Sequence, residues 1–183
     1  MKILNVVGAR PNFIKIAPII EQMKQSPRIV CTLLHTGQHY DENMNAAFFN
    51  QLNIPSPDIN LGIKDASNVQ QIAQVLQKFE PIVLREKPHA ILVVGDVNST
   101  LACSMVAAYH KIKIIHVEAG LRSFDLSMPE EINRMLTDKI SDLLFATEAS
   151  GVENLKNEGI DPRKIHLVGN VMVDTLLKHK KLA

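Results

Sequence analysis

The stretch AILVVGDVNSTLACSMVAAYHKIKIIHVEAG, residues 90–120, decides the fold. It contains two continuous apolar runs, Ala90–Val94 and residues 112–117, joined by a segment of helical length that ends near Tyr109. Continuous apolar runs are typical of strands buried on both faces, and a helix between two of them is the crossover of a parallel sheet. The stretch therefore predicts a β-α-β unit.

The same alternation extends outward in both directions. Further strands are predicted at residues 2–8, 29–34, 58–61, 143–146 and 165–168, and helices at residues 12–24, 42–50, 69–85, 129–140 and 151–157. An unbroken βα alternation predicts an α/β fold, a doubly wound parallel sheet with helices on both faces.

Composition excludes several classes of function. The chain has 183 residues, a net charge of +1 and only 4% aromatic residues, so we expect one domain and neither nucleic-acid nor membrane binding. Its two cysteines, Cys31 and Cys103, lack CxxC spacing and lie in apolar surroundings, which indicates buried thiols of a cytoplasmic protein. Neither a signal peptide nor a membrane span is predicted.

Two acids follow the two strands of the central stretch. Asp96 comes just after Ala90–Val94, and Glu118 directly after residues 112–117. The carboxyl ends of parallel strands frame the ligand crevice of an open α/β sheet, so both are candidates for chemistry. The alternative role for Asp96 is to cap the following helix, but Asn98 or Ser99 can do that.

A third acid follows twelve residues after Glu118. Pro129 suits the first position of a helix, which places Glu130 and Glu131 in its first turn. Glu130 can converge with the other acids. The alternative is that both glutamates only complement the helix dipole, and spacing alone does not decide between the two.

Cations and a polar loop surround the other strand ends. Arg10 and Lys15, at the start of the first helix, suit a diphosphate, whereas the absence of GxGxxG argues against NAD. His35 and His39 belong to a polar loop after the second strand, and no third ligand lies nearby, so we predict hydrogen bonding there and no metal site.

Several motifs together resemble the non-hydrolysing UDP-N-acetylglucosamine 2-epimerases, in their amino-terminal half. They are GARPNFIKIAP (8–18), TGQHYDENM (36–44), VGDVNSTL (94–101), HVEAGLRSFDLSMPEEINR (116–134) and VGNVMVDT (168–175). The resemblance implies a Rossmann-like amino-terminal domain of a GT-B-type two-domain enzyme. Residues 1–175 would form that domain and residues 176–183 the start of the connection to a second, UDP-binding domain, so these 183 residues alone are expected to be inactive.

The resemblance also implies an activity and roles for residues. The family eliminates UDP from UDP-N-acetylglucosamine and adds it back after protonation on the other face of C2, without metal or other cofactor, typically as a homodimer. The catalytic positions match Asp96, Glu118 and Glu130. The substrate-binding positions match Arg10, Lys15, His39, Arg122 and Arg134.

The chain departs from this pattern at two places, and other functions stay open. Gln74 stands where many bacterial members have an arginine linked to allosteric control, and the loop between Arg122 and Pro129 is shorter than usual. Related enzymes epimerise UDP-diacetamido-uronic acids. The alternatives from other classes are the acceptor domain of a GT-B glycosyltransferase, which needs no cluster of three acids, and a non-catalytic nucleotide-binding module.

Overall fold

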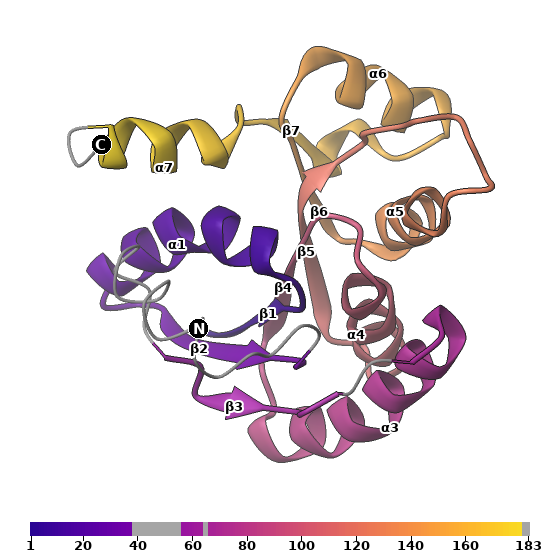
Figure 1. Ribbon diagram of the computed structural model, residues 1–183. Coiled ribbons are helices and arrows are strands. Elements are labelled where there is room, and N and C mark those ends of the chain that lie inside the picture. The colour runs from indigo at the N-terminus through magenta and orange to yellow at the C-terminus, as the bar shows by residue number, and fades with distance from the viewer. Residues whose placement is uncertain (38–55, 64–65, 181–183) are drawn as a thin grey trace.

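The structure, a computed structural model, describes residues 1–37, 56–63 and 66–180. Within these ranges the core is a sheet of seven strands in the order β3-β2-β1-β4-β5-β6-β7 (Figure 1). Every neighbouring pair is parallel, which confirms the predicted sheet. The strands are β1 (Lys2–Val7), β2 (Val30–His35), β3 (Ile59–Asn60), β4 (Ala90–Val94), β5 (Lys113–Ala119), β6 (Leu143–Ala146) and β7 (Ile165–Leu167).

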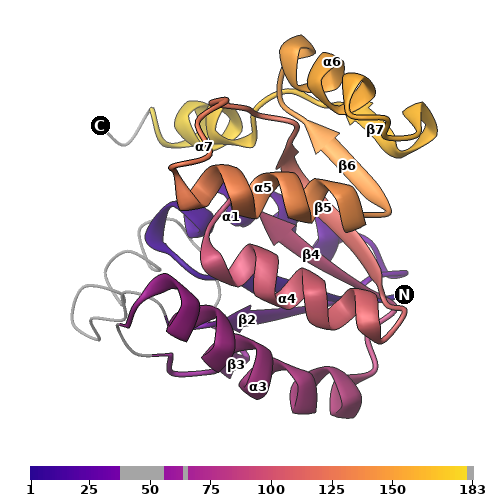
Figure 2. The same ribbon diagram turned by 90° about the vertical axis from the view of Figure 1, so that its right-hand side faces the viewer.

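Helices cover both faces of the sheet, as predicted. In Figure 2, α3, α4 and α5 lie side by side in front of the sheet, and α1 lies behind it. α7 packs along α1 (Figure 1). The helices are α1 (Arg10–Gln25), α3 (Asn68–Glu86), α4 (Asn98–Tyr109), α5 (Pro129–Ile140), α6 (Ala149–Asn157), the 3-10 turn η1 (Pro162–Lys164) and α7 (Val171–His179).

The core has one layer on each side of the sheet. On one side, Phe79 of α3 and Cys103 of α4 pack with Ile91 of β4. On the other side, Phe13 and Ile16 of α1 pack against the β4 side chains that point to the opposite face of the sheet. Because both faces of β4 are buried, its uninterrupted apolar run is required, which is why its limits were predicted correctly.

The strand order reverses between β1 and β4. Strands β2 and β3 lie on one side of β1, and β5, β6 and β7 lie beyond β4 on the other. In doubly wound sheets the crevice at the carboxyl ends of such a pair is the usual place for a ligand. The segments after Val7 and Val94 therefore mark the expected site.

The prediction that Asn98 or Ser99 caps α4 was wrong. The residue that caps α4 is Val97, and no side chain makes the cap hydrogen bond. The Asn98 amide instead donates to Asn68 Oδ1 at 3.0 Å and to Gln71 Oε1 at 2.8 Å. Packing against α3 therefore takes the asparagine side chain away from the cap.

Ser99 does not cap α4 either, because it lies against Gly8. A methyl group at Gly8 would lie 3.2 Å from Ser99 Cβ and closer still to its hydroxyl oxygen. A glycine at the end of β1 thus lets the first turn of α4 approach the strand closely.

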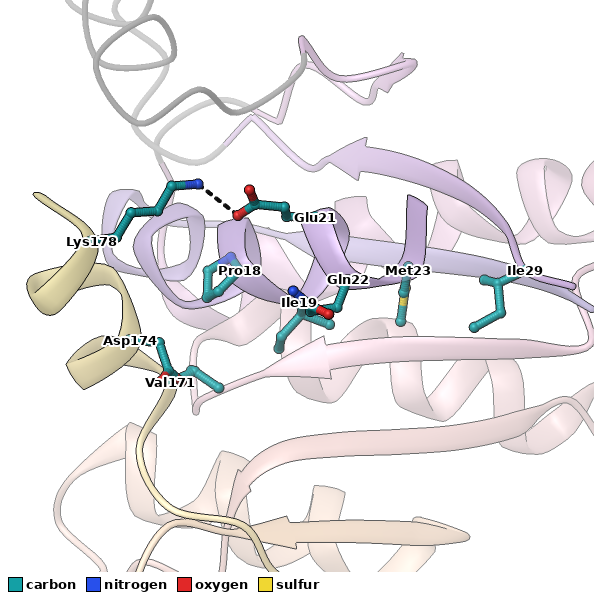
Figure 3. Close-up of a pocket in the computed structure, with 9 residues that line it drawn as sticks. All are labelled: Pro18, Ile19, Glu21, Gln22, Met23, Ile29, Val171, Asp174 and Lys178. Carbon is teal, nitrogen blue, oxygen red and sulfur yellow. Dashed lines mark hydrogen bonds and ion pairs between the residues drawn. The ribbon is translucent and has the colours of Figure 1, made fainter. Parts of the chain in front are cut away.

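A groove of about 640 Å³ runs between α1 and α7 (Figure 3). α7 is held there by a 2.9 Å hydrogen bond from Thr175 Oγ1 to the Ile14 carbonyl and a 2.6 Å ion pair between Lys178 and Glu21. The described residues that line the groove include none of the candidate site residues. Among the described residues, no helix is both long and apolar enough to cross a bilayer.

Candidate active site

Glu118 lies within β5, not after it as predicted. The pairing of β5 with β6 shifts between Val117 and Ala119, so Glu118 is the additional residue of a β-bulge. Its φ of +71° belongs to the left-handed region, which a residue with a side chain rarely adopts. From this position Glu118 Oε2 forms an ion pair with Lys15 of α1.

This ion pair lies against the end of β4. A methyl group at Gly95 would be 3.4 Å from both Glu118 Oε2 and Lys15 Nζ. Gly95 has a φ of +69°, a backbone conformation that favours glycine. The contact places Glu118 and Lys15 beside the residue that precedes Asp96, at the carboxyl edge where they were expected.

Asp96 is held from α5 at two points. Its carboxylate forms an ion pair with the Arg134 guanidinium, and its carbonyl accepts a 2.9 Å hydrogen bond from Asn133 Nδ2. Arg134 NH1 also contacts Glu131 at 2.8 Å. Burial acts against the charged guanidinium, but contacts with Asp96 and Glu131 outweigh it, and the pKa of Arg134 is raised.

The two adjacent glutamates of α5 differ in environment. Both lie in the first turn after Pro129, as predicted. Glu130 is exposed, and its carboxylate makes no ion pair or hydrogen bond with the described residues. Glu131 is 1% exposed and accepts hydrogen bonds of 3.0 Å from the amides of Ser123 and Phe124.

Glu131 is a residue that the sequence reasoning treated only as a helix-dipole partner. Burial would raise the pKa of its carboxyl, but the amides of Ser123 and Phe124 and the charge of Arg134 outweigh burial and lower it. The i, i+3 spacing of Glu131 and Arg134 was the available signal for an ion pair on α5.

Arg122 lies in a buried cluster of charged groups. Its side chain is 1% exposed, with NH1 2.8 Å from Asp138 and NH2 2.7 Å from Glu158. Burial disfavours its charge, but Glu158 and Asp138 raise its pKa overall. In this arrangement the guanidinium faces protein carboxylates, so a ligand can contact it directly only after the cluster opens.

Asp138 and His116 complete that cluster, and neither was a candidate from the sequence. His116 contacts Asp138 Oδ1 through Nδ1 at 2.6 Å and the Gly95 carbonyl through Nε2 at 2.9 Å. Asp138 also accepts a 3.1 Å hydrogen bond from the Gly120 amide. Burial would raise the pKa of Asp138, but His116 and Arg122 lower it. The cluster ties the turn after β4 to the turn after β5.

The side chains of two predicted binding residues lie outside the described part. Arg10 is the first residue of α1, but its side chain is not among the described ones. His39 falls within residues 38–55, which are likewise outside the description, as is the helix predicted at residues 42–50. Their predicted roles stay predictions.

The fold and the site together define a Rossmann-like α/β domain with two carboxylate–cation pairs at the edge where its strand order reverses. Such an arrangement is suited to ligand binding coupled to acid–base chemistry. The family model described as UDP-N-acetylglucosamine 2-epimerase matches residues 21–183, and the chain belongs to that family.

Individual relatives match along the whole chain. A UDP-N-acetylglucosamine 2-epimerase homolog from Methanococcus maripaludis is 50% identical over 182 residues, covering 100% of this chain and 50% of the relative. A UDP-2,3-diacetamido-2,3-dideoxy-D-glucuronate 2-epimerase from Pseudomonas aeruginosa is 47% identical, covering 97% of this chain and 51% of the relative.

A solved structure confirms the fold. It is that of the Methanocaldococcus jannaschii UDP-GlcNAc 2-epimerase in complex with UDP-GlcNAc and UDP, with a TM-score of 0.96 and 46% identity. The match covers 100% of this chain and 50% of that one. The chain thus spans about half the length of the relatives it matches, corresponding to their amino-terminal half.

Proposed function

We propose that this protein epimerises a UDP-linked 2-acetamido sugar at C2, UDP-N-acetylglucosamine being the first candidate substrate. The observation that carries the proposal is the pairing of two carboxylates with cations at the carboxyl edge of the sheet, where the strand order reverses. Glu118 pairs with Lys15, and Asp96 pairs with Arg134. Family membership supports the reaction class.

The chemistry requires acids and cations close together. No carbonyl adjoins C2, so its proton leaves only as the bond between C1 and the UDP oxygen breaks. UDP is eliminated, 2-acetamidoglucal remains bound, and UDP adds back after protonation on the opposite face. One carboxylate must take the proton and another group must return it, while fixed cations stabilise the departing diphosphate.

The candidate residues divide between these tasks. We assign acid–base roles to Asp96, Glu118 and Glu130, without choosing which is the base. Lys15 is held beside Glu118 and Gly95, so an incoming diphosphate can draw its ammonium away and leave the Glu118 carboxylate free to act. No metal or other cofactor enters this scheme.

The remaining binding residues are assigned by the same resemblance. Arg10 at the start of α1 would bind the diphosphate with Lys15, and His39 and Arg134 would contact the substrate. Arg122 is proposed to join them once its contacts with Asp138 and Glu158 rearrange.

The names of relatives support two sugar substrates. The Methanococcus maripaludis and Pseudomonas aeruginosa proteins are 50% and 47% identical to this chain, yet their names refer to different UDP-sugars. We therefore retain a UDP-diacetamido-glucuronate as the second candidate substrate. A C6 carboxylate in place of the hydroxymethyl group would call for one further cation in the site.

We further propose a cytoplasmic homodimer with a GT-B arrangement. Residues 1–175 would be the first domain and 176–183, within and after α7, the start of a connection to a UDP-binding domain. Support for a dimer comes from an exposed apolar stripe along α5 and the residue that precedes it, spaced every four residues: Met128, Ile132, Leu136 and Ile140. Leu136→Glu should convert a dimer to monomers in light scattering, and a wild-type monomer would contradict the proposal.

The activity is tested with protein expressed from the complete reading frame. Each UDP-sugar is incubated in deuterated water, and NMR follows deuterium at C2 and formation of the C2 epimer. We expect both signals with one of the two sugars. If neither sugar exchanges its C2 proton while the protein is folded and binds UDP, the proposed reaction is wrong.

A further inference from the structure

We propose that Glu131 is a positioning residue that holds the Asp96 carboxylate in its working orientation through Arg134. The inference rests on the proposed function, because it assigns to Glu131 the placement of one of the proposed acids. Glu130 and Glu131 thus have separate tasks, although they are adjacent in sequence.

The first step concerns how firmly Glu131 is fixed. Its side chain is 1% exposed. Oε1 accepts a hydrogen bond from the Phe124 amide, and Oε2 accepts from the Ser123 amide and from Arg134 NH1. A buried carboxylate is tolerated only with such partners, and here both oxygens are occupied. Glu131 therefore has one orientation.

The second step carries this orientation to Asp96. Arg134 uses NH1 for Glu131 and NH2 for Asp96. The guanidinium is planar, so fixing one arm of the fork fixes the direction of the other. Without Glu131, Arg134 can rotate about its terminal bonds, and it no longer fixes the orientation of the Asp96 carboxylate.

The third step separates the side chain of Asp96 from its backbone. The Asp96 carbonyl is held independently by Asn133 Nδ2 at 2.9 Å, and this same Nδ2 also donates to Asn98 Oδ1 at 3.1 Å. Loss of Glu131 should therefore leave the backbone after β4 in place. The expected defect is confined to the direction of one carboxylate.

Glu131 also holds the loop that follows Glu118. Its bonds to the amides of Ser123 and Phe124 fix a turn in which Phe124 has a φ of +59°. A purely structural role would consist of this loop contact alone. The experiment must therefore distinguish loss of loop stability from misplacement of Asp96.

The test uses steady-state kinetics of protein from the complete reading frame. Glu131→Gln replaces one carboxylate oxygen by an NH₂ group, which then faces the N–H donors that Glu131 binds. The substitution should lower kcat roughly 10- to 100-fold and change KM by less than about threefold. In an Asp96→Asn background the same substitution should change kcat by less than about threefold. The proposal would be overturned if the fold-losses in kcat of the two single variants multiplied in the double variant. It would also be overturned if Glu131→Gln kept the full kcat.

The matched control is Asp142→Asn. Like Glu131, Asp142 binds a basic side chain and a backbone amide, with Lys113 Nζ at 2.7 Å and the Ile114 amide at 3.0 Å, but at the start of β5. It should lower stability without changing kcat. If Glu131→Gln does not fold, Glu131→Asp keeps the charge but is one methylene too short to span both partners, and the same kinetic criteria apply.

A crystal structure of Glu131→Gln separates this proposal from the proposed activity. We expect the Arg134 fork turned and the Asp96 carboxylate displaced, with the Asp96 backbone unmoved. An unmoved carboxylate would overturn the positioning role even in an active enzyme. A wild-type protein that epimerises neither sugar would instead refute the proposed function, whatever the position of Asp96.

Discussion

Replacing Gly120 with alanine should destabilise the protein considerably more than the same replacement at Gly169. Both glycines have a φ of +82°, so both variants incur the same left-handed backbone penalty. Only Gly120 also faces another part of the backbone. A methyl group there would lie 2.8 Å from the Gly151 carbonyl carbon and closer still to its oxygen, whereas nothing lies within 4 Å at Gly169.

The magnitude follows from these two contributions. A left-handed residue with a side chain costs roughly 1–2 kcal/mol. Overpacking costs about 1–3 kcal/mol more, and a backbone neighbour cannot rotate aside as a side chain would. We therefore expect a loss of roughly 2–5 kcal/mol for Gly120→Ala and roughly 1–2 kcal/mol for Gly169→Ala.

Urea unfolding of the 183-residue chain, followed by circular dichroism, measures both values. A difference of 1–3 kcal/mol corresponds to roughly 2–12 °C in Tm for a chain of this size. Equal losses at the two positions would refute the argument, because they would show that the approach of Gly120 to Gly151 does not require glycine.

Three further predictions concern chemistry, pH and length. Glu118→Gln should preserve the fold and reduce turnover at least 100-fold in protein from the complete reading frame, with Asp142→Asn as control; unchanged turnover would make Glu118 structural. Burial lowers the pKa of His35 from 6.5 to about 4, so the unfolded chain binds the proton first as pH falls. The His35 contribution to the free energy of unfolding should thus fall by ~3 kcal/mol between pH 6.5 and 4, and His35→Gln should make the slope in urea titrations shallower by that amount; a wild-type profile flat over this window would contradict it. The 183 residues by themselves should fold, bind UDP-N-acetylglucosamine only weakly and exchange no C2 proton in deuterated water, and exchange near the full-length rate would place the whole site in this chain.

The strands were predictable because burial on both faces leaves a direct signature. Ala90–Val94 and Leu143–Ala146 were located to the residue. The position of Glu118 after an apolar strand correctly indicated the carboxyl edge. Its place inside β5 was not readable, since a β-bulge depends on pairing with a neighbouring strand that the local sequence does not encode.

The burial of α5 shows a different limit. Ile132, Leu136 and Ile140 form an apolar stripe that ordinarily marks the buried face of a helix. Here these side chains are 37–49% exposed, and Glu131 and Asp138 are buried instead. Which of two adjacent glutamates is buried depends on the rotation of the helix about its axis, and the local sequence does not encode that rotation.

The packing of α7 on α1 has a consequence for biosynthesis. Thr175 bonds the carbonyl of Ile14 across 161 positions of sequence. At a ribosomal rate of roughly 5–20 residues per second, α1 leaves the tunnel roughly 10–30 s before its partner helix exists. Throughout that interval α1 lacks its contacts with α7, including the Thr175 hydrogen bond and the ion pair between Lys178 and Glu21. The nascent chain is then a better substrate for chaperones and proteases than the finished protein, and completion of α7 ends this vulnerability.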